Sequence, residues 1–60
     1  MTEQTFTISI IEKHRKVRVL YKRDGQYHVY SCPDVNGSTF FSSDKTKAYD
    51  GFVRKLTSLL

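Results

Sequence analysis

The fold is decided by residues 16–32, KVRVLYKRDGQYHVYSC. In the first half of this stretch, Val17, Val19 and Tyr21 alternate with other residues, which is typical of a half-buried strand over residues 16–22. Asp24-Gly25 is a strong signal for a hairpin turn, and residues 26–32 follow as the next strand. The stretch therefore predicts an antiparallel hairpin at the centre of the fold.

Two loops can close this hairpin, and they orient the side chains differently. A two-residue loop, Asp24-Gly25, sets Lys22 opposite Tyr27 and mixes apolar and charged groups on both faces. A three-residue loop over residues 23–25, with Gly25 at positive φ, separates the faces, and because a slip in register turns every side chain over, we favour it. Its core pairs are Tyr21 with Tyr27, Val19 with Val29, and Val17 with Ser31. Its outer pairs are Lys22 with Gln26, Leu20 with His28, and Arg18 with Tyr30.

Outward from the hairpin, the pattern adds a strand on each side and a helix. Residues 5–11 alternate apolar and hydroxyl side chains, so a strand with Phe6, Ile8 and Ile10 inward is expected. Residues 33–37 have turn chemistry, and residues 38–42 predict a short fourth strand. Ser43 or Asp44 then caps a helix. Its apolar stripe is Ala48, Tyr49, Phe52, Val53, Leu56, Leu59 and Leu60.

These elements predict an α+β fold in the order β-β-β-β-α. An antiparallel sheet of three to four strands packs on one C-terminal helix, in a single domain spanning residues 1–60. Gly51 lies within the helix, where it costs about 1 kcal/mol relative to alanine, and we expect it to permit close packing on a strand. Tyr21, Tyr27 and Tyr49 are expected in the core, and Tyr30 on the surface.

Length and composition narrow the class of protein. A chain of 60 residues can form one small domain and leaves no room for a deep substrate cleft. Its single cysteine, Cys32, excludes an internal disulfide and fits the reducing cytoplasm of a bacterium or host cell. Residues 1–4 do not resemble a signal peptide. No run approaches the roughly 20 apolar residues of a membrane span, so no membrane is expected as a partner.

The residues capable of chemistry do not form a catalytic or metal-binding pattern. His14, His28, Cys32 and Asp34 lack the spacing of a zinc site. His28 and Cys32 lie four residues apart on one strand, roughly 13 Å by strand rise, so the two side chains cannot form a nucleophile pair. We therefore expect neither an enzyme nor a cofactor.

The charge pattern points to a binding surface. The formal net charge is +4, and six of the ten lysines and arginines fall within residues 13–23, which contain no acid. Such a local excess attracts phosphates, acidic proteins or anionic surfaces. With the preferred register, the cations and the outer face of the hairpin form one candidate nucleic-acid site. Its residues are Lys13, Arg15, Lys16, Arg18, Lys22, Arg23, Gln26, His28 and Tyr30.

A first resemblance involves residues 20–27, Tyr30, the Gly37 turn, Phe40 and the helix start at residues 45–48. In these positions the chain resembles the arm-type DNA-binding domain of phage and transposon tyrosine integrases. That family backs three antiparallel strands with one helix and lays the sheet in the major groove of DNA. The extra N-terminal strand and the lack of a catalytic domain depart from the family and imply an accessory DNA binder. By position, the resemblance would put at the DNA Arg18, Lys22, Arg23, Gln26, His28 and Tyr30.

A second resemblance involves residues 25–27, the CPDVNG turn at residues 32–37, and the helix start with Asp44, Thr46 and Ala48. Here the chain is similar to the HicB-like antitoxin domain, which implies a protein that covers a toxin or another partner. Members of that family are acidic and continue further after the helix, so the basic strands of this chain depart from it.

The sequence thus predicts a small basic regulator or accessory protein of a phage or mobile element. Its expected partner is nucleic acid, with duplex DNA foremost, bound through the exposed sheet face. The alternative is a protein-binding inhibitor that blocks a host or toxin protein. Ile11 and Leu20 face away from the expected core, and residues 5–11 would form an exposed edge. A homodimer through this edge strand is compatible with both functions.

Overall fold

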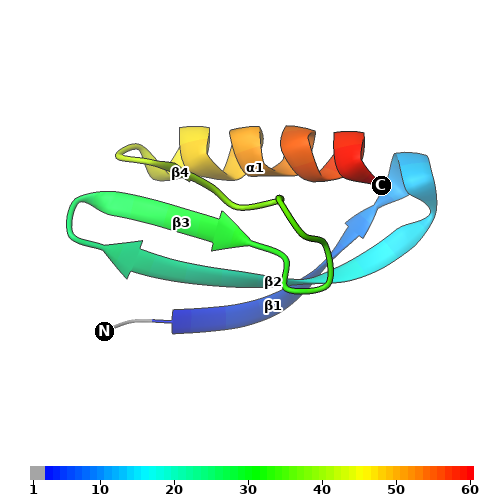
Figure 1. The fold of residues 1–60 in the computed structure, drawn as a ribbon, viewed down its shortest axis with the longest axis horizontal. Helices are drawn as coiled ribbons and strands as arrows, with labels where there is room; N and C mark the ends of the chain where they lie inside the picture. The colour runs from blue at the N-terminus through cyan, green and yellow to red at the C-terminus, as the bar shows by residue number, and fades with distance from the viewer. Residues whose placement is uncertain (1–2) are drawn as a thin grey trace.

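The chain folds into one twisted sheet with a helix along one side, as seen in a computed structural model that describes residues 3–60 (Figure 1). Met1 and Thr2, part of the N-terminal segment considered above, lie outside the described residues. In chain order the elements are β1 (Glu3–Ile10), η1 (Ile11–Lys13), β2 (Arg15–Asp24), β3 (Tyr27–Ser31), β4 (Phe40–Ser42) and α1 (Lys45–Leu59). The four strands lie in the order β1-β2-β3-β4 and each neighbouring pair is antiparallel. The predicted β-β-β-β-α fold is confirmed.

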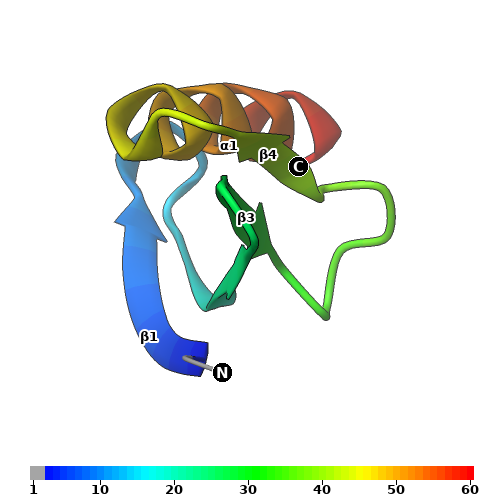
Figure 2. The same cartoon turned by 90° about the vertical axis from the view of Figure 1, so that its left-hand side faces the viewer.

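The helix covers only part of the sheet. It packs mainly on β3 and β4, and Figure 2 shows β4 close beneath α1 while the N-terminal part of β1 lies far from the helix. In Figure 1 the C-terminal end of α1 and the turn between β1 and β2 lie at the same end of the molecule. Within residues 3–60, no helix covers the opposite face of the sheet.

Strand alternation sorts the side chains of β2 as predicted. Val17, Val19 and Tyr21 are buried beneath the helix, whereas Arg18 and Lys22 are exposed on the other face. Residues paired across an antiparallel sheet share a face. The pairing of β1 with β2 therefore sets the apolar residues of β1 beside the buried residues of β2. Phe6 is opposite Val19, and Ile8 is opposite Val17.

The predicted hairpin register is wrong. β2 continues through Asp24, which pairs with Tyr27, so the loop is the two-residue Gly25-Gln26 with Gly25 at φ +60°. Tyr21 therefore pairs with Tyr30, and not with Tyr27. The side chain of Arg23 also supports the turn, with its Nε donating to the carbonyl of Gly25 at 3.2 Å.

This register places Tyr30 in the core, which corrects its expected surface position. Tyr30 is 4% exposed and its ring centroid lies 4.9 Å from that of Tyr21 and 5.8 Å from that of Phe52. The rings of Phe6 and Tyr49 meet it edge-on at 6.5 Å and 5.4 Å. Burying the large Tyr30 ring among aromatic neighbours is worth more than keeping Val29 beside Val19 in the core. This explains why the observed pairing prevails.

The helix begins and packs largely as its sequence indicates. Asp44 is the N-cap, and its Oδ1 accepts hydrogen bonds from the backbone N–H groups of Thr46 at 2.9 Å and Lys47 at 3.2 Å. Ala48, Phe52 and Leu56 are fully buried against the sheet. The apolar stripe is narrower than predicted, because Leu59 and Tyr49 are exposed, although Tyr49 still touches Tyr30 with its ring.

A buried serine organises the loop between β3 and β4. Ser38 Oγ accepts a hydrogen bond from the N–H of Cys32 at 3.0 Å, and its hydroxyl faces the carbonyls of Val35 at 2.8 Å and Cys32 at 3.2 Å. Gly37 supplies the positive φ of +81° that the turn requires. These bonds keep the buried backbone of the loop satisfied and lead the chain into β4.

Gly51 permits the close approach of α1 to β4, as expected. A Cβ placed at Gly51 would lie 2.6 Å from Cζ and 2.9 Å from Cδ2 of the Phe40 ring. We predict that Gly51→Ala lowers the free energy of unfolding by up to about 2 kcal/mol in urea denaturation. Overpacking costs roughly 1–3 kcal/mol and outweighs the gain in helix propensity of about 1 kcal/mol.

Two further variants separate the steric effect from helix propensity. Ser58→Ala, at an exposed site of the same helix, should leave stability unchanged or slightly raised. Phe40→Leu combined with Gly51→Ala should cost less than the sum of the two single changes, because the smaller side chain relieves the overlap. A Gly51→Ala protein more stable than the parent would contradict this packing.

The alkaline limit of stability should depend on Tyr30. Burial raises the pKa of the Tyr30 phenol above its ordinary value of 10.0, with Tyr21 and Tyr49 adding to the shift. The unfolded phenol ionises first, so its contribution to stability is complete below about pH 10 and is lost as pH rises through the folded pKa. Urea denaturation from pH 7 to 11 should show this loss, and Tyr30→Phe should make it smaller. An identical decline in both proteins would contradict the assignment.

Candidate nucleic-acid interface

The face of the sheet opposite the helix is the candidate interface, and we call it the open face. In each strand every second side chain points to the helix, and the side chains between them point to the open face. The open face consists of Glu3, Thr5, Thr7, Ser9, Lys16, Arg18, Leu20, Lys22, Asp24, Tyr27, Val29, Ser31 and Phe41.

Three of the predicted site residues lie together on this face. Lys16, Arg18 and Lys22 project from β2 at alternate positions and are exposed. The one ion pair within residues 3–60 joins Asp50 and Arg54 on α1 at 3.3 Å. None of the three cations of the open face forms an ion pair in the part of the chain that is described, although Glu3 lies opposite Lys22 and Asp24 shares the face.

An aromatic pair lies beside these cations. Tyr27 and Phe41 are 40% and 59% exposed, and their rings meet edge-on with centroids 5.5 Å apart. The register carries one row across all four strands, in the order Glu3, Lys22, Val29 and Phe41. A lysine thus lies two strands away from an exposed phenylalanine, with half-buried Val29 between them.

On the β1 side the open face is lined with hydroxyl groups. Thr7 pairs with Arg18 and Ser9 pairs with Lys16, and all four side chains are exposed. Hydroxyls can donate to phosphate oxygens beside the cations. The face therefore combines a basic and hydroxyl-bearing half over β1 and β2 with an aromatic half over β3 and β4.

The remaining predicted site residues lie elsewhere. Arg15 and Arg23 are on the helix side of β2, Lys13 is in η1, and Gln26 is in the hairpin turn. Strand alternation thus divides the basic residues of β2 between the two faces of the sheet, while the turns before and after β2 hold Lys13 and Gln26. Cations that lie close together in the sequence therefore do not form one continuous surface.

His28 and Tyr30 are corrected from the open face to the helix side. Both follow from the register, which sets His28 opposite Arg23 and Tyr30 opposite Tyr21. His28 Nδ1 lies 2.6 Å from Tyr21 Oη, and the two rings stack with centroids 5.9 Å apart. The imidazole therefore contacts a core tyrosine and forms one end of the aromatic cluster.

Tyr27 and Phe41 are the site residues that sequence reasoning missed. The preferred three-residue loop predicts Tyr27 in the core, because it pairs Tyr27 with Tyr21. The sequence pattern places Phe41 on the fourth strand and predicts no role for it. The only signal that could have found both was the hairpin register, since the observed pairing of Asp24 with Tyr27 turns them outward together.

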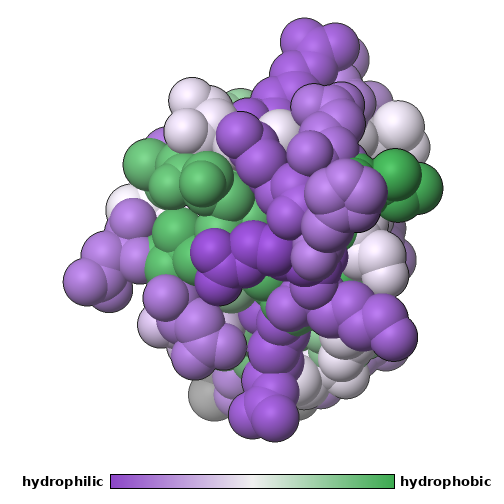
Figure 3. All heavy atoms as spheres, turned by 90° about the vertical axis from the view of Figure 1, so that its right-hand side faces the viewer, coloured by the Kyte–Doolittle hydropathy of each residue, from purple (hydrophilic) through white to green (hydrophobic). Residues whose placement is uncertain are grey.

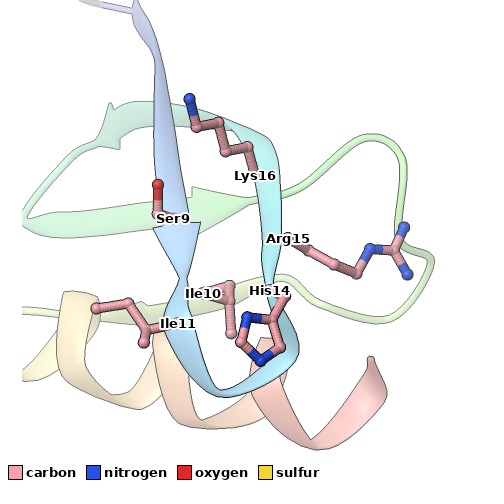
Figure 4. A pocket seen from close by; sticks show the side chains of 6 residues that line it. All are labelled: Ser9, Ile10, Ile11, His14, Arg15 and Lys16. Atoms are coloured by element: carbon pink, nitrogen blue, oxygen red, sulfur yellow. The ribbon is translucent and has the colours of Figure 1, made fainter.

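A hollow lies at the turn between β1 and β2 (Figure 4). Its lining residues are Ser9, Ile10, Ile11, His14, Arg15 and Lys16. His14 ends η1 in the left-handed conformation at φ 52°, and Figure 4 shows Ile11 and Arg15 pointing in opposite directions. The lining contains no carboxylate or thiol that could work with the imidazole as an acid–base pair.

Other chemical features within residues 3–60 are few. No group of three or more His, Cys, Asp or Glu side chains there could hold a metal ion. Cys32 is a free, buried thiol. Neither helix in this part of the chain has the length and apolar character needed to cross a membrane.

No protein-family model, curated protein or solved structure matches the chain. The geometry of the open face is therefore the basis for assigning a function.

Proposed function

We propose that the chain binds nucleic acid across the open face. The observation that carries this proposal is the presence, on one sheet surface that the helix does not cover, of three exposed cations and an exposed aromatic pair. Lysine and arginine supply the phosphate contacts that dominate affinity for nucleic acids. Exposed rings on a sheet surface are platforms on which unpaired bases stack.

The aromatic pair favours a strand with accessible bases. Stacking on an aromatic side chain is worth about 1–3 kcal/mol per base, and it requires bases that are not enclosed in a duplex. The resemblance to integrase arm domains instead favours a duplex, with the sheet in the major groove. A single strand and a duplex would both place phosphates against Lys16, Arg18 and Lys22. The two alternatives therefore differ in what Tyr27 and Phe41 contribute to binding.

The proposed setting of this function rests on the single cysteine and on the resemblance to integrase arm domains. We place the protein in the cytoplasm, where the thiol of Cys32 stays reduced, as a small accessory or regulatory protein of a phage or mobile element. A second candidate is a protein-binding inhibitor, because Leu20, Val29, Tyr27 and Phe41 form an apolar strip that a protein could cover. Salt dependence separates the two candidates, since phosphate contacts release counterions.

Fluorescence anisotropy with a labelled single strand, and with the duplex of the same sequence, tests the proposal. Three phosphate contacts should weaken binding about 20- to 40-fold between 50 and 200 mM salt. Replacing both Arg18 and Lys22 by alanine should weaken binding to either nucleic acid and reduce the salt slope by roughly 1.4–1.8. Replacing Lys47 and Arg54 on the exposed side of α1 removes the same charge and serves as the control, with a much smaller expected effect.

Replacing Phe41 by alanine tests the role of stacking. If bases stack on the aromatic pair, Phe41→Ala should weaken single-strand binding by about 1–3 kcal/mol and leave the salt slope unchanged. Binding of the duplex should change little. The absence of binding to both nucleic acids at 50 mM salt, or equal losses in the helix control, would contradict the proposed function.

A further inference from the structure

The first strand is an unprotected edge of the sheet. β1 pairs with β2 without interruption from Glu3 opposite Lys22 to Ile10 opposite Arg15, and no described strand lies on its other side. Natural edge strands are protected by lysines, prolines, bulges or shortness. Residues 4–11, QTFTISII, contain no charge, proline or glycine. The row of backbone donors and acceptors along this edge is therefore available to another strand.

The other edge of the sheet is protected by comparison. β4 has only three residues, and α1 packs closely along it. Lys55 of the helix donates from Nζ to the carbonyl of Thr39, next to this strand, at 3.1 Å. Pairing with a further strand is thus favoured at β1 and disfavoured at β4.

Apolar side chains near β1 are incompletely covered. Phe6 and Ile8 point to the helix side but are only half-buried, since α1 lies mainly over β3 and β4. Ile11, directly after the strand, is 82% exposed. Figure 3, which faces the end of the molecule with the turn between β1 and β2, shows hydrophobic atoms on both sides of a band of hydrophilic side chains. A strand added at this edge would cover apolar surface as well as backbone.

We propose that the occupant of this edge is β1 of a second copy, paired antiparallel about a two-fold axis through Thr7. This pairing sets Phe6 opposite the partner's Ile8 on the helix side, and Thr5 opposite the partner's Ser9 on the open face. Between residues 5 and 9, apolar groups meet apolar groups and hydroxyls meet hydroxyls, and Gln4 meets the partner's Ile10, which is already buried in its own core. Moving the axis to Phe6 would instead set Gln4 against Ile8, whose side chain is only half-buried. The strand is thus complementary to itself, as a two-fold interface requires.

Charge also favours a second copy over a charged partner. With a net charge of +4, the chain would attract acidic proteins, but its cations lie on β2, the turns and α1. Residues 4–11 are neutral, so two copies can approach there without setting like charges opposite each other. The resulting sheet would have eight strands, with both open faces on the same side. The inference does not depend on the proposed nucleic-acid binding, although such a dimer would double that surface.

Sedimentation equilibrium without nucleic acid is the first test. The chain should show twice its mass of 7.0 kDa at concentrations of roughly 0.1–1 mM, a range in which even weak pairs assemble. A protein that remains at 7.0 kDa across this range would overturn the proposal, and the edge would then be open to a strand of a different protein.

Cysteine cross-linking tests the register of the dimer. In a Cys32→Ala background, Thr7→Cys should form an intermolecular disulfide on mild oxidation. Cα atoms directly opposite in an antiparallel pair lie about 4.5–5.5 Å apart, within the roughly 4.4–6.8 Å that a disulfide spans. Thr5→Cys alone should not cross-link, because two copies of residue 5 would be offset by about 13 Å. A mixture of Thr5→Cys and Ser9→Cys proteins should cross-link.

Controls keep the cross-linking result decisive. Thr39→Cys places a thiol at another exposed threonine and should remain uncross-linked. Dimers that cross-link equally at residues 39 and 7, or not at residue 7, would overturn the proposed edge. As an independent variant pair, Thr7→Lys and Thr7→Glu should each be monomeric, and an equimolar mixture of the two should restore the dimer mass. Residue 7 is exposed, so each single variant should retain the parent circular dichroism spectrum.

Discussion

The packing of the Tyr30 ring between β2 and α1 is the interaction on which the rest of the structure depends. The ring lies against Tyr21 on the neighbouring strand and Phe52 on the helix, and it joins the sheet to the helix at the centre of the core. Side chains alternate along a strand, so burying Tyr30 commits Tyr27 and Val29 to the opposite face. The open face is therefore a consequence of the core.

The parts of the fold that the sequence predicted are those governed by a single local rule. Alternation along β2 buries Val17 and Val19, and Asp44 caps the helix as its position indicates. The hairpin register could not be predicted in the same way. Arg23, Asp24, Gly25 and Gln26 suit several loops, and the choice among them depends on how tightly Tyr30 packs against a helix more than ten residues away in the chain.

The candidate site was predictable in its cations and not in its aromatic residues. Arg18 and Lys22 are outward in either register because they alternate with buried valines and Tyr21. Arg15 and Arg23 belong to the same basic segment but lie on the helix side, since strand geometry divides consecutive charges between two faces. Tyr27 and Phe41 become neighbours only once β3 is correctly paired with both β2 and β4.

The most direct test of this account is the environment of the tyrosine rings, measured by nuclear Overhauser contacts in solution. The structure predicts contacts from the Tyr30 ring to Phe52 and Tyr21, and from the Tyr27 ring to Phe41. Contacts from the Tyr27 ring to Phe52 and Tyr21, with Tyr30 free of both, would show that the hairpin adopts another register. In that case the open face described above would not exist.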